Sequence, residues 1–184
     1  MSVHGGDNYP SLVFVTTIWL SVVLHIVGVA TPEWSSYHTP QLSATYGLWG
    51  YCVNGKCGEY RYAGKLPPPM EYSLKVCEVF AVLGLLASFL GLAMATVALL
   101  LPMMGKPKSA MFPVISLLSC VATFIFILIA TIVWRVKMNN IFIVDFQIGY
   151  SFILSIIGGI MICMGGVLFY LANRGVSHNY IPIV

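Results

Sequence analysis

Charged side chains are scarce in this chain. Only 8% of its 184 residues are charged, and Asp and Glu together number 6. A soluble globular protein has about 25% charged residues, so this composition excludes that class. The few basic residues are scattered along the sequence rather than grouped, which excludes a nucleic-acid-binding surface.

The sequence also lacks the motifs of catalytic and metal sites. It has no metal-ligand spacing of His, Cys, Asp or Glu, no paired nucleophile and base, and no phosphate-binding loop. Cys77, Cys120 and Cys163 lie in apolar segments, where a free cysteine usually acts as a small hydrophobic residue. We therefore expect no enzymatic activity and no cofactor.

Long apolar segments are present instead. Hydrophobic residues make up 59% of the chain, and the mean hydropathy is +0.89. Four segments can each cross about 30 Å of hydrocarbon, namely residues 12–31, 76–101, 112–134 and 148–172. They predict an all-α membrane bundle of four transmembrane helices in a single domain, 1–184. The connections are a first outer loop (32–75), an inner loop (102–111), a second outer loop (135–147) and a tail (173–184).

A β-hairpin is predicted in the first outer loop. Asn54-Gly55 is a strong signal for a two-residue type I′ loop, because both residues tolerate the positive φ that this loop requires. In such a hairpin Cys52 and Cys57 face each other at a non-hydrogen-bonded pair, where the Cα atoms come close enough for a disulfide. A persistent disulfide forms on the oxidising side of a membrane, so we expect this loop to be extracellular and both termini cytoplasmic.

Further strands are predicted around this hairpin. They cover residues 34–39, 46–53 and 56–62, and in the central strand Leu48 and Trp49 point to opposite faces. Trp34 and Trp49 suit the junction between sheet and bundle, because their rings are largely apolar with one polar N–H. Residues 141–146 of the second outer loop are either an edge strand beside this sheet or an extension of the helices.

Two ionisable groups fall within the predicted spans. We expect a neutral His25 to hydrogen-bond a neighbouring helix, and Glu78 to pair with Lys75 near the interface. A transport path normally needs a chain of ionisable groups, which the third and fourth spans lack. Transport through the bundle is therefore not expected.

Small residues recur on one face of two spans. The repeats are every four residues on the second span and every seven on the fourth, which lets helix backbones approach closely. The residues are Ala87, Gly91, Ala95, Gly158, Gly159, Gly165 and Gly166. We interpret them as packing positions of the bundle, with contact to another membrane protein as the alternative.

One combination of residues resembles a known family. A four-span chain with Trp34, then Gly47-Leu48-Trp49, then Cys52 and Cys57 is similar to the claudin superfamily. That superfamily also includes the peripheral myelin protein group and the calcium-channel γ and AMPA-receptor auxiliary subunits. The segment 146–149 is likewise similar to the aromatic-x-x-Gly that precedes the fourth span in the family. The shorter spacing between the two cysteines, and a tail without the Tyr-Val ending, suggest a divergent member.

The resemblance implies both a fold and a function. The expected fold is a left-handed four-helix bundle with a small extracellular antiparallel β-sheet of four or five strands. In claudins this sheet lines paracellular pores, chains polymerise side by side in the membrane, and the outer loops meet partners on the opposing cell. We therefore expect a plasma-membrane protein of cell–cell junctions, with a homo-oligomer or polymer in cis, a claudin-like partner in trans, and surrounding lipid. The candidate contacts are Val53, Asn54, Gly55, Lys56, Phe142, Val144 and Phe146.

An auxiliary-subunit role is the alternative. In that hypothesis the small-residue helix face docks on an ion channel or receptor and changes its gating or trafficking. The γ-type subunits usually have longer cytoplasmic tails, which favours the junction role. The hydrophobic C-terminal Val184 is compatible with PDZ-domain binding, although Pro182 lacks the N–H that a pairing strand supplies.

Overall fold

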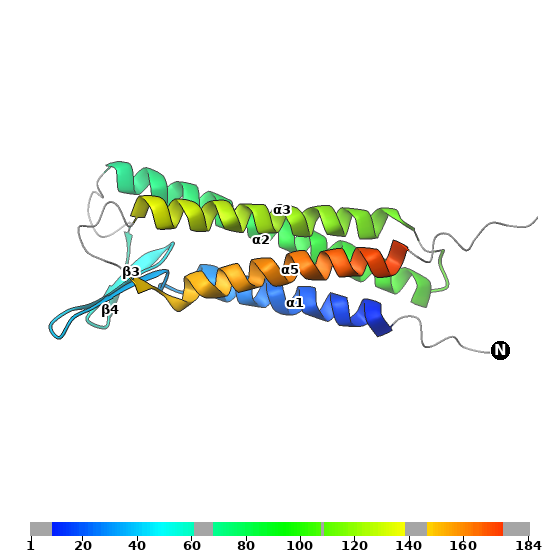
Figure 1. The fold of residues 1–184 in the computed structure, drawn as a ribbon, viewed down its shortest axis with the longest axis horizontal. Helices are drawn as coiled ribbons and strands as arrows, with labels where there is room; N and C mark the ends of the chain where they lie inside the picture. The colour runs from blue at the N-terminus through cyan, green and yellow to red at the C-terminus, as the bar shows by residue number, and fades with distance from the viewer. Residues whose placement is uncertain (1–8, 61–67, 108, 139–146, 175–184) are drawn as a thin grey trace, which may run out of the picture.

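Four long helices form an elongated bundle, with a small β-sheet at one end (Figure 1). The computed structural model describes residues 9–60, 68–107, 109–138 and 147–174. The helices are α1 (Tyr9–Ala30), α2 (Pro68–Met103), α3 (Met111–Val133) and α5 (Tyr150–Arg174), each long and apolar enough to cross a membrane. The last turn of α3 continues as a π-helix, η2 (Trp134–Met138). The predicted four-helix membrane bundle with a β-sheet is confirmed.

Helix α2 begins about two turns before the predicted second span. Pro68 is the first residue of the helix, a position where proline fits because the first-turn N–H groups have no intrahelical partner. Lys75 pairs with Glu71 at 2.6 Å in this added segment. Glu71, four residues earlier on the same helix face, is thus the hydrogen-bonded partner, and both side chains are exposed. The expected partner, Glu78, interacts with Lys75 only through charge attraction.

Among the described residues the sheet is antiparallel and has five strands, in the order β4-β3-β2-β1-β5. Their bounds are β1 (Ser35–His38), β2 (Ser43–Tyr46), β3 (Gly50–Val53), β4 (Lys56–Glu59) and β5 (Gln147–Ile148). The predicted edge strand at 141–146 lies outside the described residues. Strand β5, which follows that segment, pairs with β1, so the second outer loop does contribute to the sheet.

The central predicted strand, 46–53, is wrong as a single element. It is divided into β2 and β3 by a turn in which the N–H of Gly47 donates to the carbonyl of Gly50 at 2.8 Å. Leu48 and Trp49 therefore leave the sheet, and the predicted alternation fails at these two residues. The physical reason is that both side chains contact the helix bundle, as described below.

Helices α2 and α3 pack with a seven-residue repeat. Three hydrogen bonds join α3 to α2, from Ser116 Oγ to Gly91 O at 2.9 Å, from Thr123 Oγ1 to Gly84 O at 3.4 Å, and from Cys77 Sγ to Ala130 O at 3.4 Å. Each contact lies seven residues from the next on both helices. A seven-residue repeat keeps one seam facing the partner and favours left-handed packing.

The glycines of α5 divide between two neighbours. Gly158 and Gly165 face α1, while Gly159 and Gly166 face α3. The fit is close: a Cβ at Gly166 would lie 2.6 Å from the Cβ of Cys120. On α2, Gly91 and Ala95 are buried and Ala87 is half-buried. These positions are thus used for packing inside the bundle.

His25 is buried on α1 beside α2. The imidazole lies against Gly84 of α2, where an added Cβ would be 3.3 Å from Nε2. Neither ring nitrogen has a hydrogen-bond partner within 3.5 Å among the described groups. The backbone of Ala81 on α2 still interacts with the ring, so the expected contact with a neighbouring helix is present but does not meet strict hydrogen-bond geometry. The glycine makes room for the imidazole between the two helices.

Two alanines of α2 provide a matched test of this packing. Ala95 is fully buried, whereas Ala93, two residues away, is exposed. We expect Ala95→Leu to lower the free energy of unfolding by about 1–3 kcal/mol through overpacking, and Ala93→Leu to change it by about 0.5 kcal/mol or less. Thermal melting of both variants in the same detergent measures the difference. Equal melting temperatures would contradict the assigned faces.

Candidate functional site

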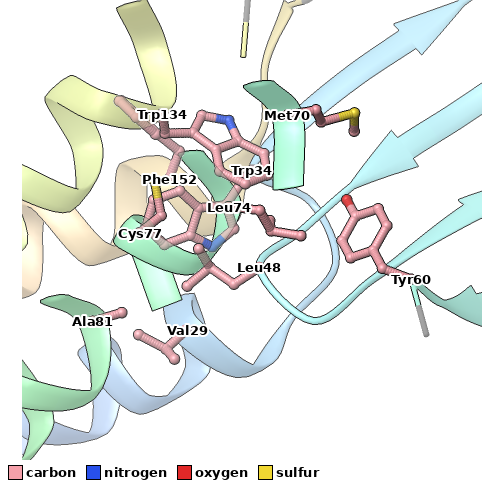
Figure 2. Packing of buried hydrophobic residues seen from close by; sticks show 10 residues of the cluster. All are labelled: Val29, Trp34, Leu48, Tyr60, Met70, Leu74, Cys77, Ala81, Trp134 and Phe152. Carbon is pink, nitrogen blue, oxygen red and sulfur yellow. The ribbon is translucent and has the colours of Figure 1, made fainter. Parts of the chain in front are cut away.

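Trp34 lies at the centre of the contact between sheet and bundle (Figure 2). Its side chain is 1% exposed. Its ring centroid lies 5.3 Å from that of Trp134 and 5.7 Å from that of Phe152, the latter edge-on. Such geometry adds to the stabilisation from burial alone. All four helices supply residues to the surrounding cluster, together with the chain that forms the sheet.

The tryptophans Trp34 and Trp49 cap the end of α1. The last carbonyls of a helix have no intrahelical partner, and leaving them unpaired in an apolar environment is costly. Trp34 Nε1 donates to Gly28 O at 2.8 Å, and Trp49 Nε1 donates to Val29 O at 2.9 Å. The two indoles thus satisfy consecutive carbonyls, and each holds the sheet to the helix.

The two caps differ in burial. Trp49 remains 44% exposed, whereas Leu48 beside it is completely buried in the Trp34 cluster. Gly47 precedes them where the chain passes Pro32 so closely that a Cβ would overlap the Pro32 Cα. Gly47, Leu48 and Trp49 therefore have three roles: close backbone approach, core packing, and a cap at the surface. The sequence predicted the junction for both tryptophans but gave no indication of this division.

Trp134 completes the anchor and was missed by sequence reasoning. It lies in η2, is 1% exposed, and donates from Nε1 to Ser35 Oγ at 2.9 Å. This bond connects the end of α3 directly to β1. The available signal was an indole at the end of an apolar span, where tryptophan is common at membrane interfaces.

Gly149 holds the start of α5, at the end of the second outer loop, against the beginning of the first outer loop. Its N–H donates to Trp34 O at 3.1 Å, and the N–H of Ser151 donates to Glu33 O at 3.1 Å. A Cβ at Gly149 would overlap the Glu33 carbonyl. Because only glycine permits this approach, it fixes the start of α5 beside the first strand.

The hairpin has the predicted turn and disulfide. Asn54 and Gly55 have φ values of 48° and 78°, as a type I′ loop requires. Val53 faces Lys56, and Cys52 faces Cys57 with 4.0 Å between their Cα atoms and a disulfide between their sulfurs. The prediction of this disulfide is confirmed.

A second interaction of Asn54 was not predicted. Its Oδ1 accepts from the N–H of Ser43 at 2.9 Å, and its own N–H donates to Ser43 O at 2.7 Å. The loop between β3 and β4 is thereby tied to the start of β2. The hairpin end is consequently held by three strands rather than two.

The sequence that forms the helices and the sheet matches a protein family. The model of the PMP-22/EMP/MP20/Claudin family matches residues 11–169. The chain belongs to this family. The match extends from α1 into the last turns of α5 and includes the tryptophan, glycine and cysteine pattern. A comparison with curated proteins gives no match.

In this PMP-22/EMP/MP20/Claudin chain, a tyrosine cluster supports the sheet. Tyr60 Oη donates to Gly47 O at 3.0 Å, and its ring lies 5.7 Å from that of Tyr51. Burial, with a smaller contribution from Tyr46, raises the pKa of Tyr60 well above its usual value. The phenol therefore stays neutral and keeps its proton for the hydrogen bond.

The candidate partner contacts lie at the end of the hairpin. Asn54, Gly55 and Lys56 are exposed and Val53 is half-buried. A shallow open hollow beside them is lined by Tyr51, Val53, Asn54, Lys56, Cys57 and Gly58. The other candidates, Phe142, Val144 and Phe146, lie outside the described residues. Within the described parts of the chain, no group of three His, Cys, Asp or Glu side chains could hold a metal ion.

Alanine substitutions of Trp34 and Trp49 should show how much each indole cap contributes to stability. We expect Trp34→Ala to lower the free energy of unfolding by about 3–5 kcal/mol, because it removes a fully buried ring and leaves Gly28 O unpaired. Trp49→Ala should cost clearly less, since nearly half of that side chain is exposed already. Thermal melting in detergent ranks the variants. The reverse ranking would show that Trp49 is the main anchor.

The glycine contact gives a second prediction. Gly149→Ala should lower the free energy of unfolding by about 1–3 kcal/mol, because the added methyl group meets a backbone carbonyl that cannot rotate away. Tyr150→Phe, at the exposed next residue, is the control and should be close to neutral. Thermal melting and surface delivery are measured for both. A melting temperature of Gly149→Ala equal to that of the control would contradict the close approach.

Proposed function

We propose that the protein contributes to cell–cell junctions of the plasma membrane, where its outer loops take part in adhesion and in the paracellular barrier or channel. Family membership gives a claudin-like membrane protein. The observation that carries the proposal is that several independent contacts fix the sheet to the helix bundle. Two indole caps, a buried aromatic cluster and a glycine contact hold it on the bundle.

The proposed orientation places the sheet outside the cell. The Cys52–Cys57 disulfide favours an oxidising compartment. At the opposite end of the bundle, the described charged residues are Lys106 and Arg174, both basic, as expected on the cytoplasmic side. With four spans, both termini then lie in the cytoplasm.

The proposed adhesive surface is the side of the sheet that ends in β4. Among the described strands β4 is terminal and pairs only with β3. Lys56, Cys57 and Glu59 are exposed along it. A terminal strand presents unpaired backbone groups that a partner strand can use. We propose a claudin-like chain in trans and further copies of this chain in cis as the partners, with lipid around the helices.

The auxiliary-subunit alternative depends on a different surface. It places a channel or receptor on the small-residue faces of the helices. Gly91, Ala95 and the four glycines of α5 are instead buried against neighbouring helices. Docking on a channel would therefore need another helix face, which makes the junction role the better supported proposal. PDZ binding concerns the tail at 175–184, outside the described residues.

A cell-mixing experiment tests the adhesive function. Two populations of adhesion-poor cells express the protein with different fluorescent tags and are then mixed. We expect the protein to be enriched where cells of different colours touch, and not where an expressing cell touches a non-expressing one. Uniform surface labelling would contradict trans adhesion and favour the auxiliary role.

The hairpin contribution is tested in the same assay. Lys56→Glu reverses an exposed charge at the proposed contact and should reduce enrichment several-fold. Lys137→Glu makes the same change at an exposed position of η2 and should leave enrichment unchanged. Surface biotinylation confirms equal delivery of the variants. Equal loss of enrichment in both would show that the effect is not specific to the hairpin.

A further inference from the structure

The two ends of the molecule differ in the sign of their charges. The sheet end carries both signs among its described residues, with Glu33, Glu59, Glu71 and Glu78 alongside Lys56, Lys75, Arg135 and Lys137. At the opposite end the described charged residues are Lys106, in the loop between α2 and α3, and Arg174, at the end of α5, and both are exposed. The sequence that adjoins this end adds one charge of each sign, Lys108 in the same loop and Asp7 just before α1.

Large apolar side chains accompany these cations. Met103, Met104 and Met111 are 69%, 67% and 64% exposed and flank Lys106 on both sides in the sequence. Gly105 has a φ of 71° and turns the chain sharply after α2. A short loop at the end of two apolar helices thus combines flexible thioethers with a basic group.

We propose that this basic end, formed by Met103, Met104, Lys106, Met111 and Arg174, binds anionic phospholipid. The methionine side chains enter the boundary between headgroups and acyl chains, while the cations bind the headgroup phosphate and carboxylate. The chemistry matches because the described charges at this end are all positive, and a negatively charged leaflet attracts each of them. This inference goes beyond the junction role and holds whether or not the sheet mediates adhesion.

Ser109 gives a means of reversing the interaction. It is exposed in the same loop, three residues after Lys106. A negative charge at this position would repel the headgroups and partly neutralise Lys106. Ser109→Glu should therefore weaken lipid binding, whereas Ser109→Ala should not.

Lipid-dependent thermal melting tests the proposal. The full chain in a neutral detergent is titrated with phosphatidylserine or, separately, with phosphatidylcholine. A lipid that binds the folded state alone raises the melting temperature. We expect phosphatidylserine to act at a lower concentration than phosphatidylcholine, and the difference to shrink at high salt because charges are screened. Equal curves for the two lipids would overturn the proposal.

Variants test whether the lipid-dependent thermal shift depends on the basic end. The double variant Lys106→Gln, Arg174→Gln should raise the phosphatidylserine concentration for half the thermal shift by about fivefold per basic residue removed. The matched control is Arg135→Gln, Lys137→Gln in η2 at the sheet end, which should keep the wild-type curve. Loss in the control but not in the double variant would overturn the assigned location. Should the double variant fail to fold, comparison of Ser109→Glu with Ser109→Ala decides, and equal curves for these two would overturn the proposal.

A separate control tests whether the exposed methionine side chains contribute to lipid binding. Glycerophosphoserine has the headgroup of phosphatidylserine without acyl chains. If the exposed methionines take part, this soluble headgroup should give no selective shift at concentrations where the lipid acts. A shift equal to that of the lipid would overturn the role of the methionine side chains.

Discussion

The position of the sheet depends on how the last turn of α1 satisfies its free carbonyls. This turn lies where the bundle meets the sheet, and the carbonyls of Gly28 and Val29 accept hydrogen bonds from the indoles of Trp34 and Trp49. In an apolar environment an unpaired carbonyl is costly, so the helix cannot easily release these side chains. Both indoles belong to the chain that builds the sheet. The same hydrogen bonds thus stabilise the end of α1 and the position of the sheet.

The contact is reinforced from the other helices. Trp134 from η2 and Phe152 from α5 pack around Trp34, and Gly149 brings the start of α5 against the Glu33 carbonyl. Segments that are far apart in sequence therefore meet at one residue. Trp34, Gly47 and Trp49 of the tryptophan and glycine pattern all belong to this contact.

Local features of the sequence predicted much of this arrangement. Hydropathy indicated the helices because a membrane span requires a long apolar run, and Asn54-Gly55 set the hairpin register that brings Cys52 to Cys57. The central strand was predicted wrongly, because local alternation cannot reveal that Gly47 passes against Pro32 or that Leu48 enters the core. The interaction of Trp134 with Ser35 joins residues 99 positions apart and was equally inaccessible. The errors arise where tertiary contacts override strand periodicity.

The charges of β4 bear on the proposed barrier or channel. Side chains alternate along a strand, so Lys56 and Glu59, three residues apart, point to opposite faces. Among the described residues at this end of the molecule, acidic and basic side chains are equal in number, so the sum of these charges gives no preference between ions. Selectivity in a pore depends on the charges that face its lumen. A pore lined by the Glu59 face would favour cations, and one lined by the Lys56 face would favour anions, so the orientation of the sheet in an assembly determines the sign.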